Sequence, residues 1–288
     1  MKKLITVVLA AMAVALPSSA QLLWKISGKD MPESYLLGTY HLADYAAVDS
    51  LTGVSAVMER VSGVIGEIDF MKATSAEGQQ TMAAAALAPA DSTLSVVLSQ
   101  IQLDSLQMTL DKYAGGIKVG QLDAMRPAFA AMMIEVGRAA EFTDGFSSPV
   151  DMTIQTMALE RDKTVTGLET IEDQCQALFG GDIVAQAESL VWGMNHDQEM
   201  RSTSRRIFDA YIHGDLNEIL SIIEEDKSMD QAHTERLIHL RNADWLRVLA
   251  GMLPAASLLI VVGAGHLPGE KGLIKGLRKL GFEVTPND

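Results

Sequence analysis

Cysteine is nearly absent from this chain of 288 residues, since Cys175 is the only one. An intramolecular disulfide is therefore excluded, and stability has to come from an ordinary hydrophobic core. Hydrophobic residues make up 48% of the chain, which is enough to build such a core. Cys175 has no histidine beside it in its helical stretch, so we interpret it as an inert thiol rather than a nucleophile.

Basic residues are also few: 23 Lys and Arg stand against 37 Asp and Glu, which gives a formal net charge of −14. No basic run is present after residue 20. Nucleic acids and anionic membranes are bound mainly through clustered Lys and Arg, so we expect neither as a partner. We interpret the acidic surface as a solvated one that keeps the protein soluble.

Several common catalytic and phosphate-binding motifs are missing. The sequence contains no Gly-x-x-x-x-Gly-Lys phosphate loop, no Gly-x-Ser-x-Gly nucleophile turn and no His-Glu-x-x-His zinc motif. The Gly-x-Gly at residues 263–265 lacks the third glycine of a dinucleotide site. These absences argue against a nucleotide-binding protein, a serine hydrolase of the α/β type and a zinc protease of the common helical type.

Long apolar runs are absent apart from residues 4–16, which follow two lysines and precede small residues ending at Ala20. This pattern is typical of a secretory signal peptide, and the run is shorter than the roughly 20 residues that cross a bilayer. We therefore expect a signal peptide at residues 1–20 and a single domain at residues 21–288. The protein would be exported, to a periplasm or the cell exterior, without a stable membrane anchor.

The rest of the sequence alternates between short apolar runs bounded by Gly or Pro and longer stretches with helical spacing. The short runs predict an opening hairpin and further strands, at residues 22–28, 34–41, 64–70, 163–170, 257–265 and 282–286. The long stretches predict helices at residues 81–113 (with an N-cap at Asp91 or Ser92 inside the stretch), 121–137 (with its start set by Pro127), 188–211 and 216–253. We expect an α/β fold, in which a mixed central β-sheet is covered by helices and carries a helical insertion.

Two stretches repeat one local pattern. In "YLLGTYHLADY" His41 stands three residues after Gly38, and in "LLIVVGAGHLPGE" His266 stands three residues after Gly263. Each histidine follows an apolar run that predicts a buried strand, and we interpret each glycine as the point where the backbone turns. Functional groups collect at the carboxyl ends of strands in open α/β sheets, so the two imidazoles are expected to converge.

Glu67 lies in a third short strand, "VIGEID", where its apolar neighbours predict a position in or near the core. A buried carboxylate is costly without a partner or a cation. Two imidazoles and one carboxylate form a ligand set suited to a divalent ion, with positions left open for water. Two alternatives remain open, that the histidines are ordinary loop residues and that Glu67 is paired with an arginine.

Five stretches together resemble the TraB/GumN family, which is related to the TIKI proteases. They are "YLLGTYHLAD", "VIGEIDF", "TVTGLET", "LRNADWLRVL" and "VVGAGHLPGEKGLIKGLRKLGFEV", in the order of the family and spread over nearly all of the chain after residue 20. The resemblance implies a fold similar to the erythromycin-esterase and ChaN-like proteins. It also implies metal-dependent proteolysis with manganese or cobalt, as in the animal TIKI members.

Carried over to this sequence, the functional positions of the family fall on His41, Glu67, Glu169, Arg241 and His266. The resemblance thus implies a secreted metal-dependent hydrolase, most simply a peptidase, in which both histidines and Glu67 hold a divalent ion (Mn, Co or Zn) or an activated water. Glu169 would support the site or transfer a proton. Arg241 would stabilise an oxyanion or bind a substrate carboxylate, unless it only ties a helix to the sheet.

Two other functions remain open on the same residues. The first is a protein that binds a peptide, a metal or haem without turnover. The second is a metal-independent esterase in which His41 acts as general base, oriented by Glu67 or Glu169, as in the erythromycin esterases. In each case the expected partner is a peptide or a small molecule.

Overall fold

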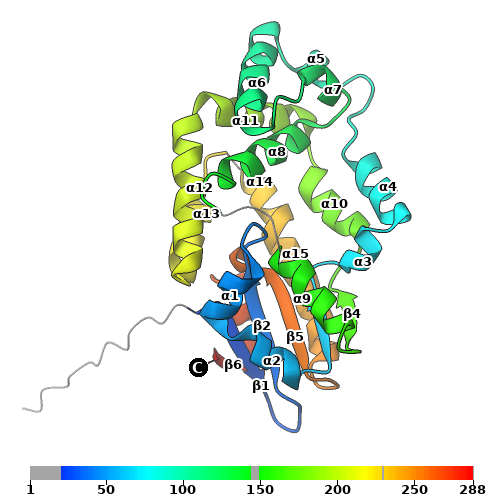
Figure 1. The fold of residues 1–288 in the computed structure, drawn as a ribbon, viewed down its shortest axis with the longest axis vertical. Coiled ribbons are helices and arrows are strands. Elements are labelled where there is room, and N and C mark those ends of the chain that lie inside the picture. The colour runs from blue at the N-terminus through cyan, green and yellow to red at the C-terminus, as the bar shows by residue number, and fades with distance from the viewer. Residues whose placement is uncertain (1–20, 144–148, 229, 288) are drawn as a thin grey trace, which may run out of the picture.

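The computed structural model describes residues 21–143, 149–228 and 230–287, and the predicted signal peptide lies outside these ranges. Within them, six strands form one mixed sheet in the order β4-β3-β5-β2-β1-β6 (Figure 1). The strands are β1 (Leu23–Ser27), β2 (Ser34–Thr39), β3 (Gly63–Gly66), β4 (Thr164–Gly167), β5 (Leu258–Gly263) and β6 (Glu283–Pro286). The predicted α/β class with a mixed sheet is confirmed.

Four neighbouring strands run parallel, since β2 and β3 both pair in parallel with β5, and β4 pairs in parallel with β3. β1 pairs antiparallel with β2, which confirms the predicted opening hairpin, and also with the closing strand β6. The carboxyl ends of β2, β3, β4 and β5 therefore meet at one edge of the sheet. The register places Thr39 beside Gly263, and Gly66 beside Val261.

The central strands are apolar because they are covered on both faces. β2 is buried at every position, and β5 at every position except the last, Gly263. Parallel strands in α/β proteins usually have this character. α9 packs on β3 and β4, whereas α16 packs on β6 and on α15. The helices nearest the sheet are α1 (Tyr45–Thr52), α2 (Val54–Arg60), α9 (Val150–Leu159), α15 (Leu240–Met252) and α16 (Leu273–Lys279).

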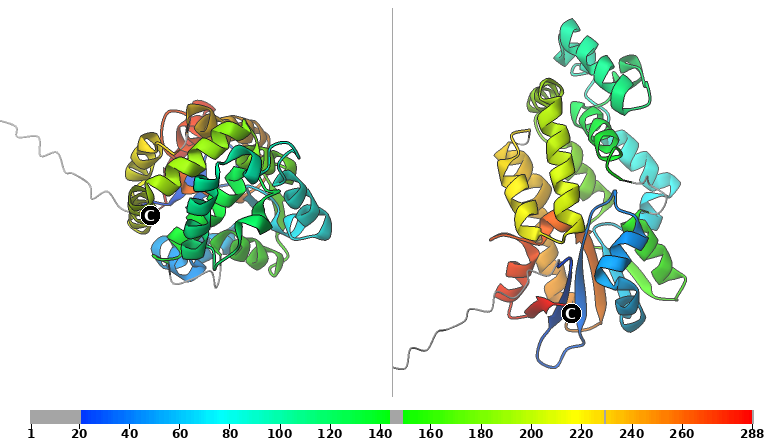
Figure 2. Two further views of the ribbon diagram at one scale, coloured as in Figure 1. Left: turned by 90° about the horizontal axis from the view of Figure 1, so that it is seen from above. Right: turned by 60° about the vertical axis from the view of Figure 1, so that its left-hand side comes forward.

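The remaining helices form the predicted insertion. α12 and α13 pack into the core of the sheet, whereas five others, α5 to α8 and α11, share an apolar core of their own. Leu94, Leu106, Leu110, Ile134 and Leu190 are all buried in that core. Figures 1 and 2 show α5 to α8 at the end of the molecule farthest from the sheet. These helices are α3 (Phe70–Ala73), α4 (Ala76–Ala85), α5 (Leu94–Val97), α6 (Gln100–Tyr113), α7 (Val119–Leu122), α8 (Pro127–Ala139), α10 (Ile171–Phe179), α11 (Ile183–Asn195), α12 (Asp197–Ile212), α13 (Leu216–Glu225) and α14 (Gln231–Thr234).

The helical pattern predicted over residues 81–113 is divided into α4, α5 and α6, and the new helices start at Thr93 and Ser99 rather than at the predicted N-cap, Asp91 or Ser92. α4 ends at Ala85, and Pro89 follows in a segment that a helix cannot easily continue through, because proline lacks the backbone donor. The chain becomes helical again after Thr93, and α6 begins with a capping box formed by Ser99 and Gln102. The start of α8 at Pro127 is as predicted.

The two later long helices are also divided. Residues 188–211 are interrupted at His196, whose backbone (φ −115°, ψ 36°) is outside the helical region. Residues 216–253 are interrupted after Glu225, and a π-helical turn (Glu235–His239) then leads into α15. π-helical turns are rare and frequently lie beside functional sites. None of the helices in the described ranges is long and apolar enough to cross a membrane.

Candidate active site at the carboxyl edge of the sheet

Three predicted site residues lie at the ends of neighbouring strands. His41 follows β2, Glu67 follows β3 directly, and His266 ends a short 3₁₀ turn (Ala264–His266) after β5. Since β5 lies between β2 and β3, the three side chains come from adjacent strand ends. The structure therefore brings together residues that are up to 225 positions apart in the sequence.

Gly263 lies in the middle of this group. A Cβ atom added to Gly263 would lie 3.3 Å from Oε1 of Glu67, 3.5 Å from Cδ2 of His266 and 4.0 Å from Nε2 of His41. The backbone of Gly263 (φ −53°, ψ 135°) is one that other residues adopt freely, so it has no strain that requires glycine. Glycine here leaves a gap between the three side chains that a single methyl group would fill.

The interpretation of both glycines as turning points is therefore wrong. Gly38 lies within β2, where an added Cβ would approach Cα of Ala264 to 3.1 Å and Cδ2 of Leu267 to 3.0 Å. Its small size permits the loop after β5 to pack closely against β2. Gly38 thus permits close packing, whereas Gly263 leaves a gap between side chains. Neither glycine has a positive φ angle.

Glu67 is only 7% exposed and remains ionised because its oxygens have strong donors. Oε1 accepts a hydrogen bond from the Gly263 N–H at 2.7 Å, and Oε2 accepts from Nη2 of Arg241 at 2.5 Å and from Nε2 of Gln174 at 3.2 Å. Burial alone would raise its pKa, but the surrounding positive charges lower the pKa to about 2. Arg241 is the permanent charge among them, since His266 is neutral.

His266 is 6% exposed, and both of its ring nitrogens have partners. Nε2 lies 3.2 Å from Nη1 of Arg241, which can only donate, so Nε2 accepts. Nδ1 then carries the proton and donates it to Oδ1 of Asn242 at 2.7 Å. Burial is the main reason why the pKa of His266 falls to about 3, and Arg241 acts in the same direction against Glu67.

His41 has the opposite environment. Its side chain is 58% exposed, and Nδ1 lies 2.8 Å from Oδ2 of Asp151 in the first turn of α9. Asp151 is itself buried, and its other oxygen accepts from the Thr39 hydroxyl at 2.7 Å. The Asp151 charge is the main cause that raises the pKa of His41. The ring is therefore fixed with Nε2 toward the space above Gly263.

Glu169 does not face that space. It lies two residues after β4, where Nε of Arg241 contacts both of its oxygens, at 3.1 and 3.0 Å, and Nε1 of Trp245 donates to Oε2 at 3.0 Å. Burial raises its pKa, and repulsion from Glu67 adds to this, against the lowering effect of Arg241. Glu169 thus holds the Arg241 guanidinium through its Nε and Nη2 groups.

Arg241 uses all five of its N–H groups within the protein. Nε donates to Glu169, Nη1 donates to the Leu237 carbonyl and to His266, and Nη2 donates to Glu67 and Glu169. Leu237 lies in the π-helical turn just before α15. In this arrangement no N–H remains for an oxyanion or a substrate carboxylate. The alternative that Arg241 ties its helix to the sheet accordingly has direct contacts in its favour.

The described residues contain no group of three or more His, Cys, Asp or Glu side chains already arranged to hold a metal ion. One of the three expected donors, Nε2 of His266, is occupied by its hydrogen bond with Arg241. Nε2 of His41 and Oε1 of Glu67 remain directed toward the same space.

Sequence reasoning missed the residues that orient the histidines. Asp151 gives the clearest signal in retrospect, as an acidic residue followed by mainly apolar side chains at the start of a helix. Trp245 is completely buried, and its ring lies 4.5 Å from that of His266 and 4.5 Å from the Arg241 guanidinium. Asn242 donates to the backbone oxygens of His266 and Lys271, and so holds the loop after β5. Nothing in the sequence alone shows these distances.

Comparison with known families agrees with the resemblance in the sequence. The TraB/PrgY/gumN family matches residues 22–286, nearly the whole described chain. The chain belongs to this family. No curated protein and no solved structure matches it significantly. Family membership and the geometry at the sheet edge are therefore the two foundations for a functional proposal.

Proposed function

We propose that this member of the TraB/PrgY/gumN family is an exported, metal-dependent hydrolase that cleaves peptides. One observation carries the proposal: each histidine has its Nδ1 fixed by a buried partner, and both rings border the same small gap at Gly263 together with Glu67. Histidines that bind metals characteristically have the second nitrogen held in this way.

The donor set fits a divalent ion of the manganese, cobalt or zinc type. Nε2 of His41 and Oε1 of Glu67 are the available donors, and Nε2 of His266 becomes the third when Nη1 of Arg241 releases it. Imidazole and carboxylate ligands suit these ions. When bound, the ion would lower the pKa of a water from 15.7 to about 7 and polarise the carbonyl to be cleaved.

The residues of the chain have distinct tasks in this proposal. Asp151 holds Nδ1 of His41 and so orients the ring, which would present Nε2 to the ion. Arg241 keeps Glu67 ionised and in place, and Glu169 in turn holds Arg241. We assign Arg241 and Glu169 to positioning, because their contacts are directed to one another and to Glu67.

The first test is hydrolysis of a fluorogenic peptide library by residues 21–288, with Mn²⁺, Co²⁺ or Zn²⁺ added and after treatment with a chelator. We expect cleavage that the chelator abolishes and one of the ions restores. His41→Ala should remove the activity, whereas His213→Ala, at an exposed histidine on the end of α12, should leave it unchanged. A folded protein that cleaves no peptide with any of the three ions contradicts the proposal.

A metal-independent hydrolase is the second candidate, and Arg241 favours it. The guanidinium already supplies a positive charge beside Glu67 and His266, and the Asp151–His41 pair has the geometry of an oriented base. Hydrolysis that persists after exhaustive chelation, and that still depends on His41 and Asp151, would select this candidate over the first.

A further inference from the structure

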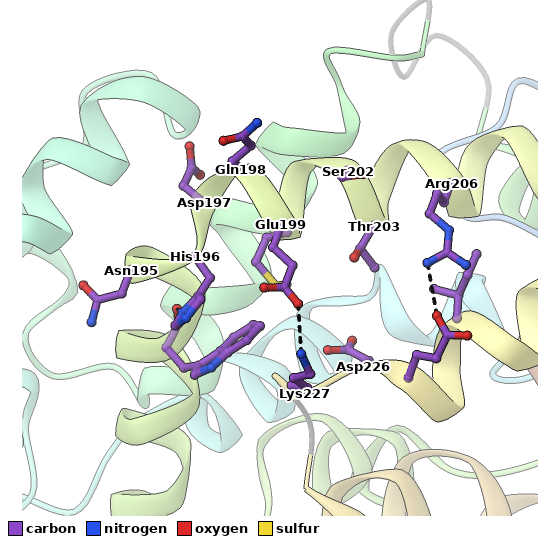
Figure 3. Close-up of a pocket in the computed structure, with 14 residues that line it drawn as sticks. Asn195, His196, Asp197, Gln198, Glu199, Ser202, Thr203, Arg206, Asp226 and Lys227 are labelled. Atoms are coloured by element: carbon purple, nitrogen blue, oxygen red, sulfur yellow. Dashed lines mark hydrogen bonds and ion pairs between the residues drawn. The ribbon is translucent and has the colours of Figure 1, made fainter.

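A pocket of about 910 Å³ lies between α12, the end of α11 and the end of α13, away from the sheet-edge site (Figure 3). None of the residues that surround Gly263 lines it. Its volume is within the range of about 300–1,000 Å³ that is usual for small-molecule sites.

Most of the residues that line the pocket are of polar types, although polar and apolar atoms contribute to its surface about equally. Of its 14 residues only Trp192, Met200 and Ile222 are apolar, and the others carry charged, amide, imidazole or hydroxyl groups. Figure 3 shows Glu199 and Thr203 on the side of α12 that faces Asp226 and Lys227, and Asp197 and Gln198 on its other side. A wholly apolar ligand would leave these groups without hydrogen-bond partners, which is costly. The pocket therefore suits a ligand with many polar groups.

The charges in the pocket are largely compensated. Lys227 is paired with Glu199 at 3.6 Å, and Arg206 with Glu225 at 3.2 Å. Asp197 is neutralised by two cations from outside the pocket. Both cations of the pocket, Arg206 and Lys227, are already in ion pairs, so phosphate would find no free cation. Asp226 is the one lining carboxylate outside these ion pairs, so a polyamine would gain a single new ion pair. A neutral ligand with many hydroxyl groups matches this lining better than an ion.

An aromatic pair lies at one end of the pocket. The rings of Trp192 and His196 are stacked, with centroids 4.2 Å apart and planes at 12°. His196 is held by a hydrogen bond from Nδ1 to the Trp192 carbonyl oxygen at 2.8 Å. The exposed amides of Asn195 and Gln198 lie close by in the sequence. Aromatic side chains with a polar edge suit ligands that are apolar on one side and wet on the other.

We propose that this pocket binds a neutral saccharide. A pyranose ring has an apolar C–H face for the aromatic pair and a rim of hydroxyls, each both donor and acceptor. An amide group such as that of Asn195 or Gln198 can donate to one hydroxyl and accept from another. The proposal is independent of the hydrolase, since the pocket shares no residue with the sheet-edge site.

The test is calorimetry and saturation-transfer NMR with three probes, maltotriose, cellotriose and chitotriose, on residues 21–288. At least one should bind saturably, and Trp192→Ala should weaken that binding at least about tenfold. Gln198→Ala, at an exposed position that folding does not depend on, should weaken it less. Gln100→Ala, an exposed glutamine near the start of α6 and outside the pocket, is the matched control and should change nothing.

Failure of all three trisaccharides to bind the folded protein would overturn the proposal. So would equal binding by the wild type and both pocket variants, because the saccharide would then lie elsewhere. Saturable binding of spermidine or inorganic phosphate at the pocket, without binding of any saccharide, would also overturn it, because the pocket would then recognise an ion rather than a neutral ligand.

Discussion

The two Gly-x-x-His motifs place chemically identical side chains in opposite environments. His41 is mostly exposed and has one partner, the buried carboxylate of Asp151. His266 is buried, neutral and held at both nitrogens by Asn242 and Arg241. The motif brings each ring to the strand edge, but the neighbouring helices decide what the ring can do. In the proposed hydrolase Nε2 of His41 is already available to the ion, whereas Nε2 of His266 has first to be released by Arg241.

Removal of Arg241 is expected to have the largest effect, because it leaves Glu67 and Glu169 buried without their cation. Arg241→Ala should lower the free energy of unfolding by about 3–5 kcal/mol. Urea denaturation measures this, with Arg247→Ala as control on the exposed side of the same helix, where a change within about 0.5 kcal/mol is expected. A loss below about 1 kcal/mol for Arg241→Ala would show that the buried pairs contribute little.

The histidines themselves should separate stability from activity. His266→Ala removes a buried ring with hydrogen bonds at both nitrogens and should lower the free energy of unfolding by about 2–3 kcal/mol. His41→Ala, at a mostly exposed side chain, should change it by less than about 1 kcal/mol and still abolish hydrolysis. If His41→Ala were the more destabilising of the two, His41 rather than His266 would be the histidine that supports the fold.

Asp151 tests the exposed half of the comparison. Asp151→Asn keeps the size of the side chain but removes the charge that orients His41 and accepts from Thr39. We expect Mn²⁺ affinity, or kcat for the metal-free alternative, to fall about 10- to 100-fold. Circular dichroism should show an unchanged fold. Full affinity and full activity in this variant would mean that the buried carboxylate does not act through His41.

The two glycines sharpen the same comparison at a smaller scale. Gly263→Ala places a methyl group among His41, Glu67 and His266 and should reduce activity about tenfold with little loss of stability. Gly38→Ala should lower the stability and leave the activity of the folded protein nearly unchanged, since its Cβ meets the backbone of the loop after β5. Gly251→Ala in α15, where nothing lies within 4 Å, is the control and should stabilise by about 0.5–1 kcal/mol. Identical behaviour of the first two variants would refute the separate roles.

The sheet was predictable because its strands have strong local signals. Apolar runs that end in glycine gave β2 and β5, and the hairpin was visible from the turn at Pro32. Helix boundaries were less predictable, since helical spacing continues across breaks such as that at His196. Capping and proline decide those breaks, and their effect depends on packing that the sequence does not display.

The site was predictable only in part. Strand ends identified His41, Glu67 and His266, because parallel strands bring their carboxyl ends to one edge. The partners that control their charges come from helices far away in the sequence, Asp151 from α9 and Arg241 from α15. Side-chain hydrogen bonds over such separations leave no periodic signal, so the saturation of Arg241 was visible only in the structure.

The most direct test of the central claim is calorimetric titration of Mn²⁺ into residues 21–288 and into the His41→Ala and Gly263→Ala variants. The proposed site predicts one ion per chain in the wild type, with binding lost or strongly weakened in both variants, because Nε2 of His41 and the space above Gly263 are both required. Absence of saturable binding in the wild type, or equal binding in all three proteins, would contradict a metal site between the two histidines.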